Sequence, residues 1–298
     1  MAKFLKRLLT VSIVFFILEK VFVIFLFLAP QNEYDNRLEK LLNEELKADV
    51  FIVGSSRGAR SILANQLENS INKTAYNLSY PGSNIIFHEF LVKTIANRAK
   101  LPKKILLIMD DPISLYETKG INYRFDRLYP LTLYNEVFNE LSLKGEKKLL
   151  LSPFVLHRLT SAHFDFSEKK LNELDTIQED GSMPLIGKAP QVVFNYSKAS
   201  PYSLENESNL KVEALKNIVE ITKLSNIELI LLITPSYKSF DNSFIERLNE
   251  ITHSEIKIFN VYDDSFKDEN LFYDNGHLNK KGAEQYTQLL ANYLKSDD

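Results

Sequence analysis

The sequence contains no cysteine. Disulfide bonds, thiolate zinc sites, iron–sulfur clusters and a cysteine nucleophile are therefore excluded. The histidines stand at positions 88, 157, 163, 253 and 277 and form no HExxH or similar helical pair, so we expect neither a catalytic metal nor another cofactor. Lysine and arginine form no dense run and the net charge is −3, which argues against a nucleic-acid partner.

The composition is that of an ordinary folded chain. Hydrophobic residues make up 45% and charged residues 25%, with no disordered or collagen-like bias. The length of 298 residues suggests about two domains, but the first stretch is almost wholly apolar and must be set aside before counting. The remainder is long enough to bury one good-sized core.

Residues 8–29 form an apolar span, LLTVSIVFFILEKVFVIFLFLA. It is about as long as a bilayer core requires, which is roughly 20 residues of helix. Lys3, Lys6 and Arg7 precede the span and favour an N-terminus left in the cytoplasm. We therefore predict a transmembrane anchor at 1–30, with the rest of the chain on the outer face. A cleaved signal peptide is the alternative; the span is long for one and lacks a small-x-small cleavage site.

Two charged residues, Glu19 and Lys20, stand in the middle of this span. Each costs on the order of 2.5–3.5 kcal/mol at the centre of a membrane helix, so something should compensate them. Partial neutralisation, water defects and snorkelling of Lys20 form one explanation. Packing against another membrane protein is the other, and a single helix does not decide between them.

From residue 48 onward, short apolar runs alternate with helical patterns. Strands are expected at 49–54, 74–80, 103–111, 227–234 and 256–261, and helices at 57–67, 85–98, 207–225, 242–253 and 281–295. This alternation predicts a three-layer, doubly wound parallel α/β sheet of the flavodoxin-like type over 48–298. Residues 31–47 are expected to form a helical stalk that leads to this domain, with its leucines on one stripe.

The alternation lapses between about 116 and 205, which we interpret as an insertion over the active edge of the sheet. An insertion of this size usually serves as a lid or a binding surface. Its aromatic patch, from Tyr116 to Phe138, could stack on sugar rings or form a small core of its own.

The first group that could carry chemistry is Gly54-Ser55-Ser56-Arg57, where a strand meets a helix N-terminus. Ligands of parallel α/β sheets bind at this edge, and the helix N-terminus supplies donors for a developing anion. A serine there can attack an ester, although such a turn alone is more often an N-cap or a phosphate-binding turn. Arg57 and Arg60 could bind an anionic substrate, but we expect solvated side chains at a helix start.

The second group is Asp274-Asn275-Gly276-His277, just before the last expected helix. Its spacing lets Asp274 hold one nitrogen of the His277 imidazole while the other takes a proton from a serine hydroxyl. Serine needs such a base because its free hydroxyl is a poor nucleophile. The serine turn and the Asp-x-x-His motif together are far more specific than either alone.

These residues resemble blocks of the SGNH (GDSL-like) serine hydrolases: GSS (54–56) block I, the Gly82 turn block II and DNGHLNKKGA (274–283) block V. The resemblance implies Ser56 as the nucleophile, an Asp274/His277 pair, and an oxyanion hole that includes the Ser56 and Gly82 N–H groups. Ser55 replaces the family's aspartate, as in membrane-anchored members that resemble the proteins of teichoic-acid D-alanyl transfer and alginate O-acetylation.

The chain departs from the third block, Gly-x-Asn-Asp, whose asparagine donates to the oxyanion. Here strand three ends in Asp110-Asp111-Pro112, and an ionised aspartate cannot donate a hydrogen bond. Either the third donor is absent, or another residue such as Asn84 supplies it, or Asp110 or Asp111 binds substrate hydroxyls. A purely structural turn before Pro112 is the alternative for both aspartates.

The resemblance implies a serine-dependent acyl-ester hydrolase or acyltransferase on the outer face of a bacterial cell membrane, acting on a cell-envelope or exported polysaccharide. A membrane acyltransferase is an expected partner. The alternative is a non-catalytic SGNH-like accessory protein that binds a membrane acyltransferase or the glycan.

Overall fold

A computed structural model describes residues 1–167, 173–261 and 264–297. The chain forms two compact units, which we call the N-terminal unit (Met1–Leu42 with Arg124–Leu171) and the sheet unit (Asn43–Tyr123 with Asn172–Asp298). The sequence predicted an anchor at 1–30, a stalk at 31–47 and one domain at 48–298. The structure instead divides the expected insertion at 116–205 between the two units.

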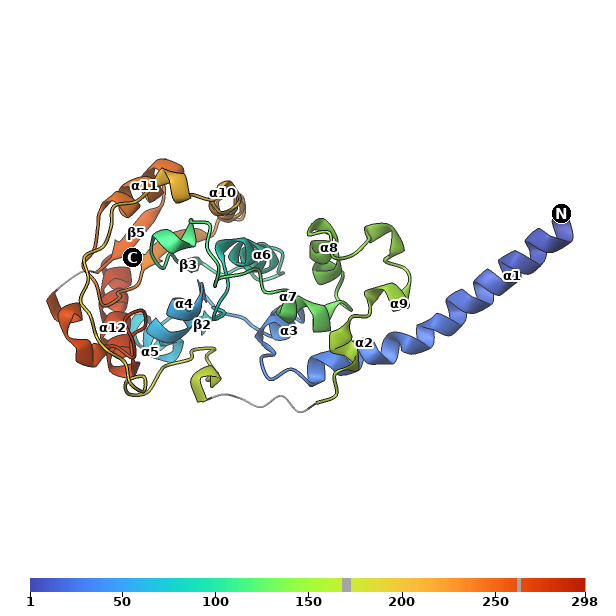
Figure 1. Cartoon of the computed structure of the whole chain (residues 1–298), viewed down its shortest axis with the longest axis horizontal. Helices are drawn as coiled ribbons and strands as arrows, with labels where there is room; N and C mark the ends of the chain where they lie inside the picture. Colours follow the sequence, from blue (N-terminus) through green and yellow to red (C-terminus); the bar gives the residue numbers. More distant parts are fainter. Residues whose placement is uncertain (168–172, 262–263, 298) are drawn as a thin grey trace. The chain divides into compact units, whose positions relative to one another are not determined.

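The sheet unit is built on five parallel strands in the order β2-β1-β3-β4-β5 (Figure 1). The strands are β1 Val50–Val53, β2 Ala75–Asn77, β3 Lys104–Ile108, β4 Glu228–Ile233 and β5 Lys257–Asn260. This is the flavodoxin-like order, so the predicted α/β class is confirmed. Every residue of β1 and β3 is buried, which explains why these strands are apolar runs in the sequence apart from Lys104 at the start of β3.

Helices cover both faces of the sheet. On one face α4 Ser56–Ser61 and α5 Ala64–Ile71 pack against α12 Lys280–Asp297, and on the other α6 Ile85–Ala96 packs against α10 Asn209–Leu224 (Figure 1). Alternate strand residues such as Ile52 and Ile108 share a buried core with Tyr286 of α12. The single helix expected at 57–67 is two helices, because Ile62 and Leu63 are extended.

The remaining elements of the sheet unit are short apart from α11 Ser243–Ile251. They are the 3₁₀ turns η2 Pro112–Ser114, η6 Glu173–Asp175, η7 Leu204–Asn206, η8 Asp264–Lys267 and η9 Glu269–Leu271. The strand order reverses between β1 and β3, and in such sheets the crevice for ligands opens outside the carboxyl ends of these two strands. Ser56 follows β1 at this point.

The N-terminal unit begins with one apolar helix, Ala2–Gln31, which is long and apolar enough to span a membrane. It consists of α1 Ala2–Leu18, the 3₁₀ turn η1 Glu19–Phe22 and α2 Val23–Gln31. The stalk expected at 31–47 is helical only in α3 Arg37–Leu42. Leu38, Leu41 and Leu42 are buried there, so the segment belongs to a small core.

The middle of the expected insertion, from Arg124 onward, completes this unit. It forms α7 Phe125–Leu128, η3 Tyr129–Leu131, α8 Asn135–Leu143, η4 Leu149–Leu151, α9 Val155–Arg158 and η5 Ser161–Phe164. Within the unit, α2 packs against η3 and η5, and α9 packs against η1. The aromatic patch contributes to the cores of the protein itself, since Phe125 stacks on Tyr129 and Tyr123 packs edge-on against Phe87.

Candidate active site

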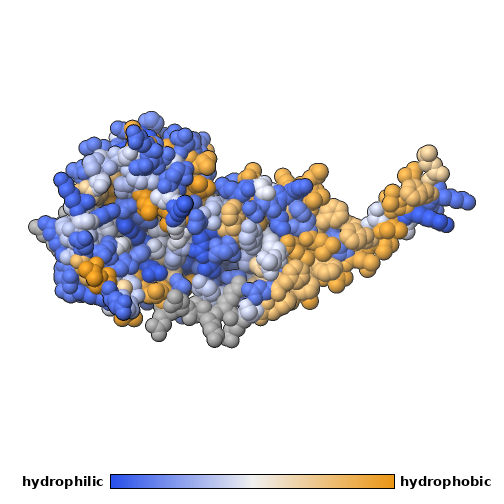
Figure 2. Space-filling model, viewed as in Figure 1, coloured by the Kyte–Doolittle hydropathy of each residue, from blue (hydrophilic) through white to orange (hydrophobic). Residues whose placement is uncertain are grey.

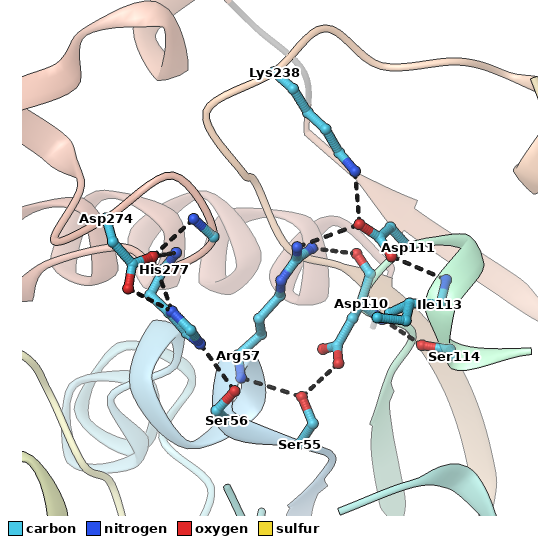
Figure 3. Close-up of polar contacts among 11 residues, drawn as sticks. Ser55, Ser56, Arg57, Asp110, Asp111, Ile113, Ser114, Lys238, Asp274 and His277 are labelled. Atoms are coloured by element: carbon cyan, nitrogen blue, oxygen red, sulfur yellow. Dashed lines mark hydrogen bonds and ion pairs between the residues drawn. The ribbon is translucent and has the colours of Figure 1, made fainter. Parts of the chain in front are cut away.

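The structure brings Ser56, His277 and Asp274 together at the carboxyl edge of the sheet (Figure 3). Ser56 Oγ lies 2.9 Å from His277 Nε2. On the far side of the ring, His277 Nδ1 lies 3.0 Å from Asp274 Oδ1 and 3.1 Å from Oδ2. The predicted contacts between these three side chains are therefore confirmed, with hydroxyl, imidazole and carboxylate joined in one chain of hydrogen bonds.

The turn between β1 and α4 selects Ser56 over Ser55. Ser55 is the N-cap of α4, and its hydroxyl accepts a hydrogen bond from the Arg57 N–H at 3.3 Å and donates to Asp110 at 2.5 Å. Ser56 is the first helical residue and points to His277 instead. Gly54 is required just before, because a Cβ there would come within 2.6 Å of Ile108 in β3.

The loop that carries the histidine is held by its own side chains. Asp274 Oδ1 accepts hydrogen bonds from the N–H groups of Gly276 and His277, at 2.8 and 2.9 Å. Asn279 donates to two backbone carbonyls, of Asn270 and Phe272. Burial opposes ionisation of Asp274, but the His277 imidazole and the two N–H groups outweigh it and lower the pKa of Asp274. The carboxylate is thus kept ionised beside the ring.

Gly82 and Asn84, the expected oxyanion residues, follow β2 at the same edge. Gly82 has a φ of +74°, which favours glycine, and its N–H has no hydrogen-bond partner in the described part of the chain. The Ser56 N–H, in the first turn of α4, is likewise without one there. Asn84 differs: it is the N-cap of α6, and its side-chain oxygen accepts from the Phe87 N–H at 3.1 Å. No contact between described residues joins Asn84 to Ser56 or His277.

A second serine–histidine pair, which sequence reasoning missed, lies in this block II turn. Ser83 Oγ is 2.8 Å from His88 Nε2, and both side chains are buried. The Ser83 hydroxyl also lies 2.6 Å from the Tyr80 carbonyl and 3.2 Å from the Gly54 carbonyl. The pair therefore ties the β1 turn to the Gly82 turn. The spacing of Ser83 and His88, five residues apart at a helix start, was the available signal.

Asp110 lies beside the nucleophile turn at the end of β3. Its Oδ2 accepts the hydrogen bond from Ser55, whereas its buried Oδ1 has no partner among the residues described. Burial raises the pKa of Asp110, and the Arg57 guanidinium and the Ser55 hydroxyl only partly offset this effect. A protonated carboxyl group can donate a hydrogen bond, unlike the ionised form assumed from the sequence.

Asp111 is held by two cations. Its Oδ2 lies 2.7 Å from Lys238 Nζ and 3.3 Å from Arg57 Nη2, and its Oδ1 accepts from the Ile113 N–H at 3.0 Å. Burial opposes ionisation, but Arg57 and Lys238 outweigh it and lower the pKa of Asp111 to about 2. Asp111 is the N-cap of η2, so the turn before Pro112 expected as an alternative is present.

The expectation that Arg57 and Arg60 are solvated is wrong. The Arg57 side chain is 13% exposed, reaches from α4 to β3 and donates to the Asp110 carbonyl at 2.6 Å. Arg60 is 9% exposed, and burial lowers the pKa of its guanidinium.

A pocket of about 520 Å³ lies next to Asp111. Its lining includes Asp111, Ile113, Tyr116, Lys198, Lys238 and Phe244. The last part of the expected insertion, 173–205, borders this edge of the sheet: Ala189 N–H donates to the Tyr273 carbonyl, Asn195 N–H to the Asn275 side chain, and Ser239 N–H to the Ser197 carbonyl. The start of the expected insertion, up to Tyr123, belongs to the same unit, and its Tyr116 lines the pocket.

No known protein family matches the chain, and no curated protein matches it either. Within the described ranges, no group of three or more histidine, aspartate or glutamate side chains is placed to hold a metal ion. The interpretation of the site therefore depends on its geometry and on the residue pattern.

Proposed function

We propose that the protein is a serine-dependent acyl-ester hydrolase or acyltransferase of the SGNH type, which acts through an acyl-enzyme on Ser56. One observation carries this proposal: the unbroken chain from Ser56 Oγ through the His277 ring to the Asp274 carboxylate. The order of these residues in the sequence and their place around a flavodoxin-like sheet support the same reaction class.

In the first half-reaction, Ser56 Oγ attacks the ester carbonyl while His277 Nε2 takes its proton. Asp274 holds the ring in the required tautomer and stabilises the imidazolium. The oxyanion that forms would be met by the N–H of Ser56, at the positive end of α4, and by that of Gly82. Collapse of the tetrahedral intermediate breaks the ester bond, and His277 gives the proton to the departing alcohol oxygen.

In the second half-reaction, water or a hydroxyl group attacks the acyl-enzyme, with His277 again as the base. Water gives hydrolysis and a sugar hydroxyl gives acyl transfer. Asp110 is a candidate third donor, because burial favours its protonated form and its Oδ1 is free of described partners. A buried carboxylic acid can stabilise an oxyanion in this way.

We further propose that the N-terminal helix anchors the enzyme in a bacterial cell membrane, with the sheet unit outside the cytoplasm. Lys3, Lys6 and Arg7 before the helix support this orientation. An enzyme tethered there could act on a cell-envelope or exported polysaccharide, which favours acyl transfer by analogy with the membrane-anchored SGNH proteins. Reporter fusions after Lys47 should be active only with a reporter that works outside the cytoplasm.

The reaction is tested with a fluorophosphonate probe on the purified full chain. Wild type should be labelled, and Ser56→Ala and His277→Ala should each abolish labelling while the circular dichroism spectrum stays unchanged. Ser55→Ala is the matched control and should keep labelling. If wild type is not labelled and Ser56→Ala still supports glycan modification in cells, the alternative of a non-catalytic accessory protein replaces this proposal.

A further inference from the structure

The positions of the charged residues determine how the N-terminal helix can span a bilayer. The apolar stretch between Arg7 and Glu19 is residues 8–18. At a rise of 1.5 Å per residue it measures roughly 16 Å, well short of the hydrocarbon core of about 30 Å. Residues 8–29 measure roughly 33 Å on the same rise. A span of sufficient length therefore includes Glu19 and Lys20 and continues into α2.

The structure compensates both charges within the N-terminal unit. Glu19 is 2% exposed, forms an ion pair with Lys20, and accepts a hydrogen bond from the Leu156 N–H at 2.9 Å. Lys20 donates to the Pro153 carbonyl at 2.5 Å, and its ammonium lies 3.9 Å from the centre of the Phe16 ring. Another membrane protein is not needed to compensate the charges, because the 153–156 segment of this chain takes that place.

Aromatic contacts extend this packing along the helix. The Phe16 ring lies 5.4 Å from Phe154, and the Phe25 ring lies 5.2 Å from Phe164 and 6.3 Å from Phe166. These contacts place 153–166 beside the middle and the second half of the span. A segment that packs against the middle of a membrane helix lies at membrane depth itself.

The outer surface of the same segment is apolar and exposed. We call the following side chains the lipid face, with their exposed fractions: Leu149 58%, Leu150 90%, Leu151 36%, Leu156 40%, Phe164 51% and Phe166 60%. The N-terminal apolar helix, beside this segment, exposes Val21, Ile24 and Phe27. Figure 2 shows the hydrophobic surface of the helix and, next to it, further hydrophobic residues among hydrophilic ones. A patch of this kind is unusual on a surface that faces water.

Two cations near the lipid face, Lys147 and Arg158, are directed to backbone carbonyls of this unit. Lys147 Nζ donates to the carbonyls of His157 and Leu159, both at 2.9 Å. Arg158 donates to the carbonyls of Ser152 and Thr132, at 3.0 and 2.8 Å. Non-helical backbone at membrane depth requires internal partners of this sort, because lipid offers no hydrogen bonds.

We propose that residues 149–166 form a second membrane-embedded element, which packs against the anchor helix and turns its lipid face to the acyl chains of the bilayer. The inference rests on the membrane anchoring proposed above. The occupant is the bilayer because the lipid face is continuous with the exposed side of a helix that spans it. The protein is then held by a helix and an adjoining helical segment, in place of a single helix with a stalk.

The absence of cysteine allows a direct test with single-cysteine variants of the full chain. Leu150→Cys and Phe164→Cys would be labelled with an NBD fluorophore and reconstituted in phosphatidylcholine–phosphatidylglycerol vesicles. Val14→Cys in α1 reports the anchor, and Leu224→Cys, 79% exposed in the sheet unit, reports water. We expect quenching by doxyl-labelled lipids to be several-fold stronger at positions 150 and 164 than at position 224. Quenching by aqueous iodide should be weaker at positions 150 and 164 than at position 224.

The outcomes separate this inference from the anchoring on which it rests. Lipid quenching at 14 with iodide quenching at 150 and 164 would overturn the embedded element and leave the anchor intact. Iodide quenching at 14 as well would show that the anchor itself is wrong. Protection of 150 and 164 from both quenchers would mean that protein covers the lipid face, which also contradicts the proposal.

Discussion

Two serine–histidine pairs lie at the carboxyl edge of the sheet, at almost the same distance, 2.9 Å for Ser56–His277 and 2.8 Å for Ser83–His88. Their surroundings differ. The first pair is partly exposed and has Asp274 behind the ring, whereas the second is buried, and its described hydrogen bonds include no carboxylate. Burial lowers the pKa of His88 to about 3. A short serine–histidine distance is therefore insufficient to identify a nucleophile.

The two serine–histidine pairs also differ in which group accepts the serine hydroxyl proton. The Ser83 hydroxyl lies 2.6 Å from the Tyr80 carbonyl, which can only accept. We assign the Ser83 proton to that carbonyl, so the His88 ring nitrogen donates to Ser83 and cannot act as its base. Among the described contacts, no carbonyl accepts the Ser56 hydroxyl proton. The Asp274 carboxylate holds the proton of the His277 ring on Nδ1, so Nε2 is the acceptor for the Ser56 hydroxyl.

The largest expected effect compares the two serines. Ser56→Ala should lower turnover of a simple ester by roughly 10⁶-fold, because the nucleophile and its base act as one unit. Adding His277→Ala to Ser56→Ala should cost little more. Ser83→Ala should retain most of the activity, since its hydroxyl only holds two turns together. Initial rates with a chromogenic ester are measured for wild type and for these three variants. Loss of activity in Ser83→Ala without unfolding would contradict the distinction between the two serines.

The second effect tests the carboxylate that only the first pair has. Asp274→Asn should lower turnover by about 10⁴-fold, because an amide at this place favours the wrong tautomer of the ring. The loop should persist, since the asparagine oxygen can still accept from the Gly276 and His277 N–H groups. The measurement is the rate together with the melting temperature. A large fall in melting temperature would instead mean that Asp274 serves mainly the loop.

Much of the sheet unit could be predicted because its signals are local. The β3 run KILLI and the Asp-x-x-His motif each lie within a few residues, and parallel strands bring their carboxyl ends to one edge. The role of Ser83 could not be predicted in this way, because it depends on a turn whose partner carbonyl, Gly54, comes from another strand end.

The N-terminal unit shows the opposite case. The sequence marks Glu19 as costly, but nothing in its pattern names Leu156 as the partner, 137 positions away. The same reason explains why the sequence did not separate residues 124–167 from the rest of the expected insertion. Contacts between distant irregular segments leave no periodic signal, so only the structure assigns them.

The third effect concerns the ion pairs beside the nucleophile. Asp111→Asn should lower the stability of the fold by at most about 2 kcal/mol at neutral pH, from the shift of its pKa from 3.8 to about 2. This contribution is present above the unfolded value of 3.8 and is lost as the pH falls through about 2. Denaturant titrations at several pH values measure it.

The matched control for Asp111→Asn is Glu213→Gln, which removes an exposed ion pair with Lys216. Exposed pairs of this kind contribute little to stability, so the control should be close to wild type. Equal effects of the two substitutions at neutral pH would show that the cations near Ser56 do not stabilise Asp111 as we infer.

The smallest effect is expected at Asp110. Burial raises the pKa of Asp110, so its protonated form stabilises the fold fully below the ordinary value of 3.8, and this stability is lost as the pH rises through the folded-state value. Asp110→Asn does not titrate and keeps an acceptor for Ser55. The variant should therefore melt at a higher temperature than wild type at neutral pH, and this gain should shrink as the pH approaches 4.

An amide is also a permanent donor, so simple ester hydrolysis by Asp110→Asn should rise if the oxyanion lacks a third hydrogen bond. A fall in hydrolysis with a raised melting temperature would mean that the Asp110 carboxyl group itself takes part, and a fall in both would mean that its negative charge is needed for the fold.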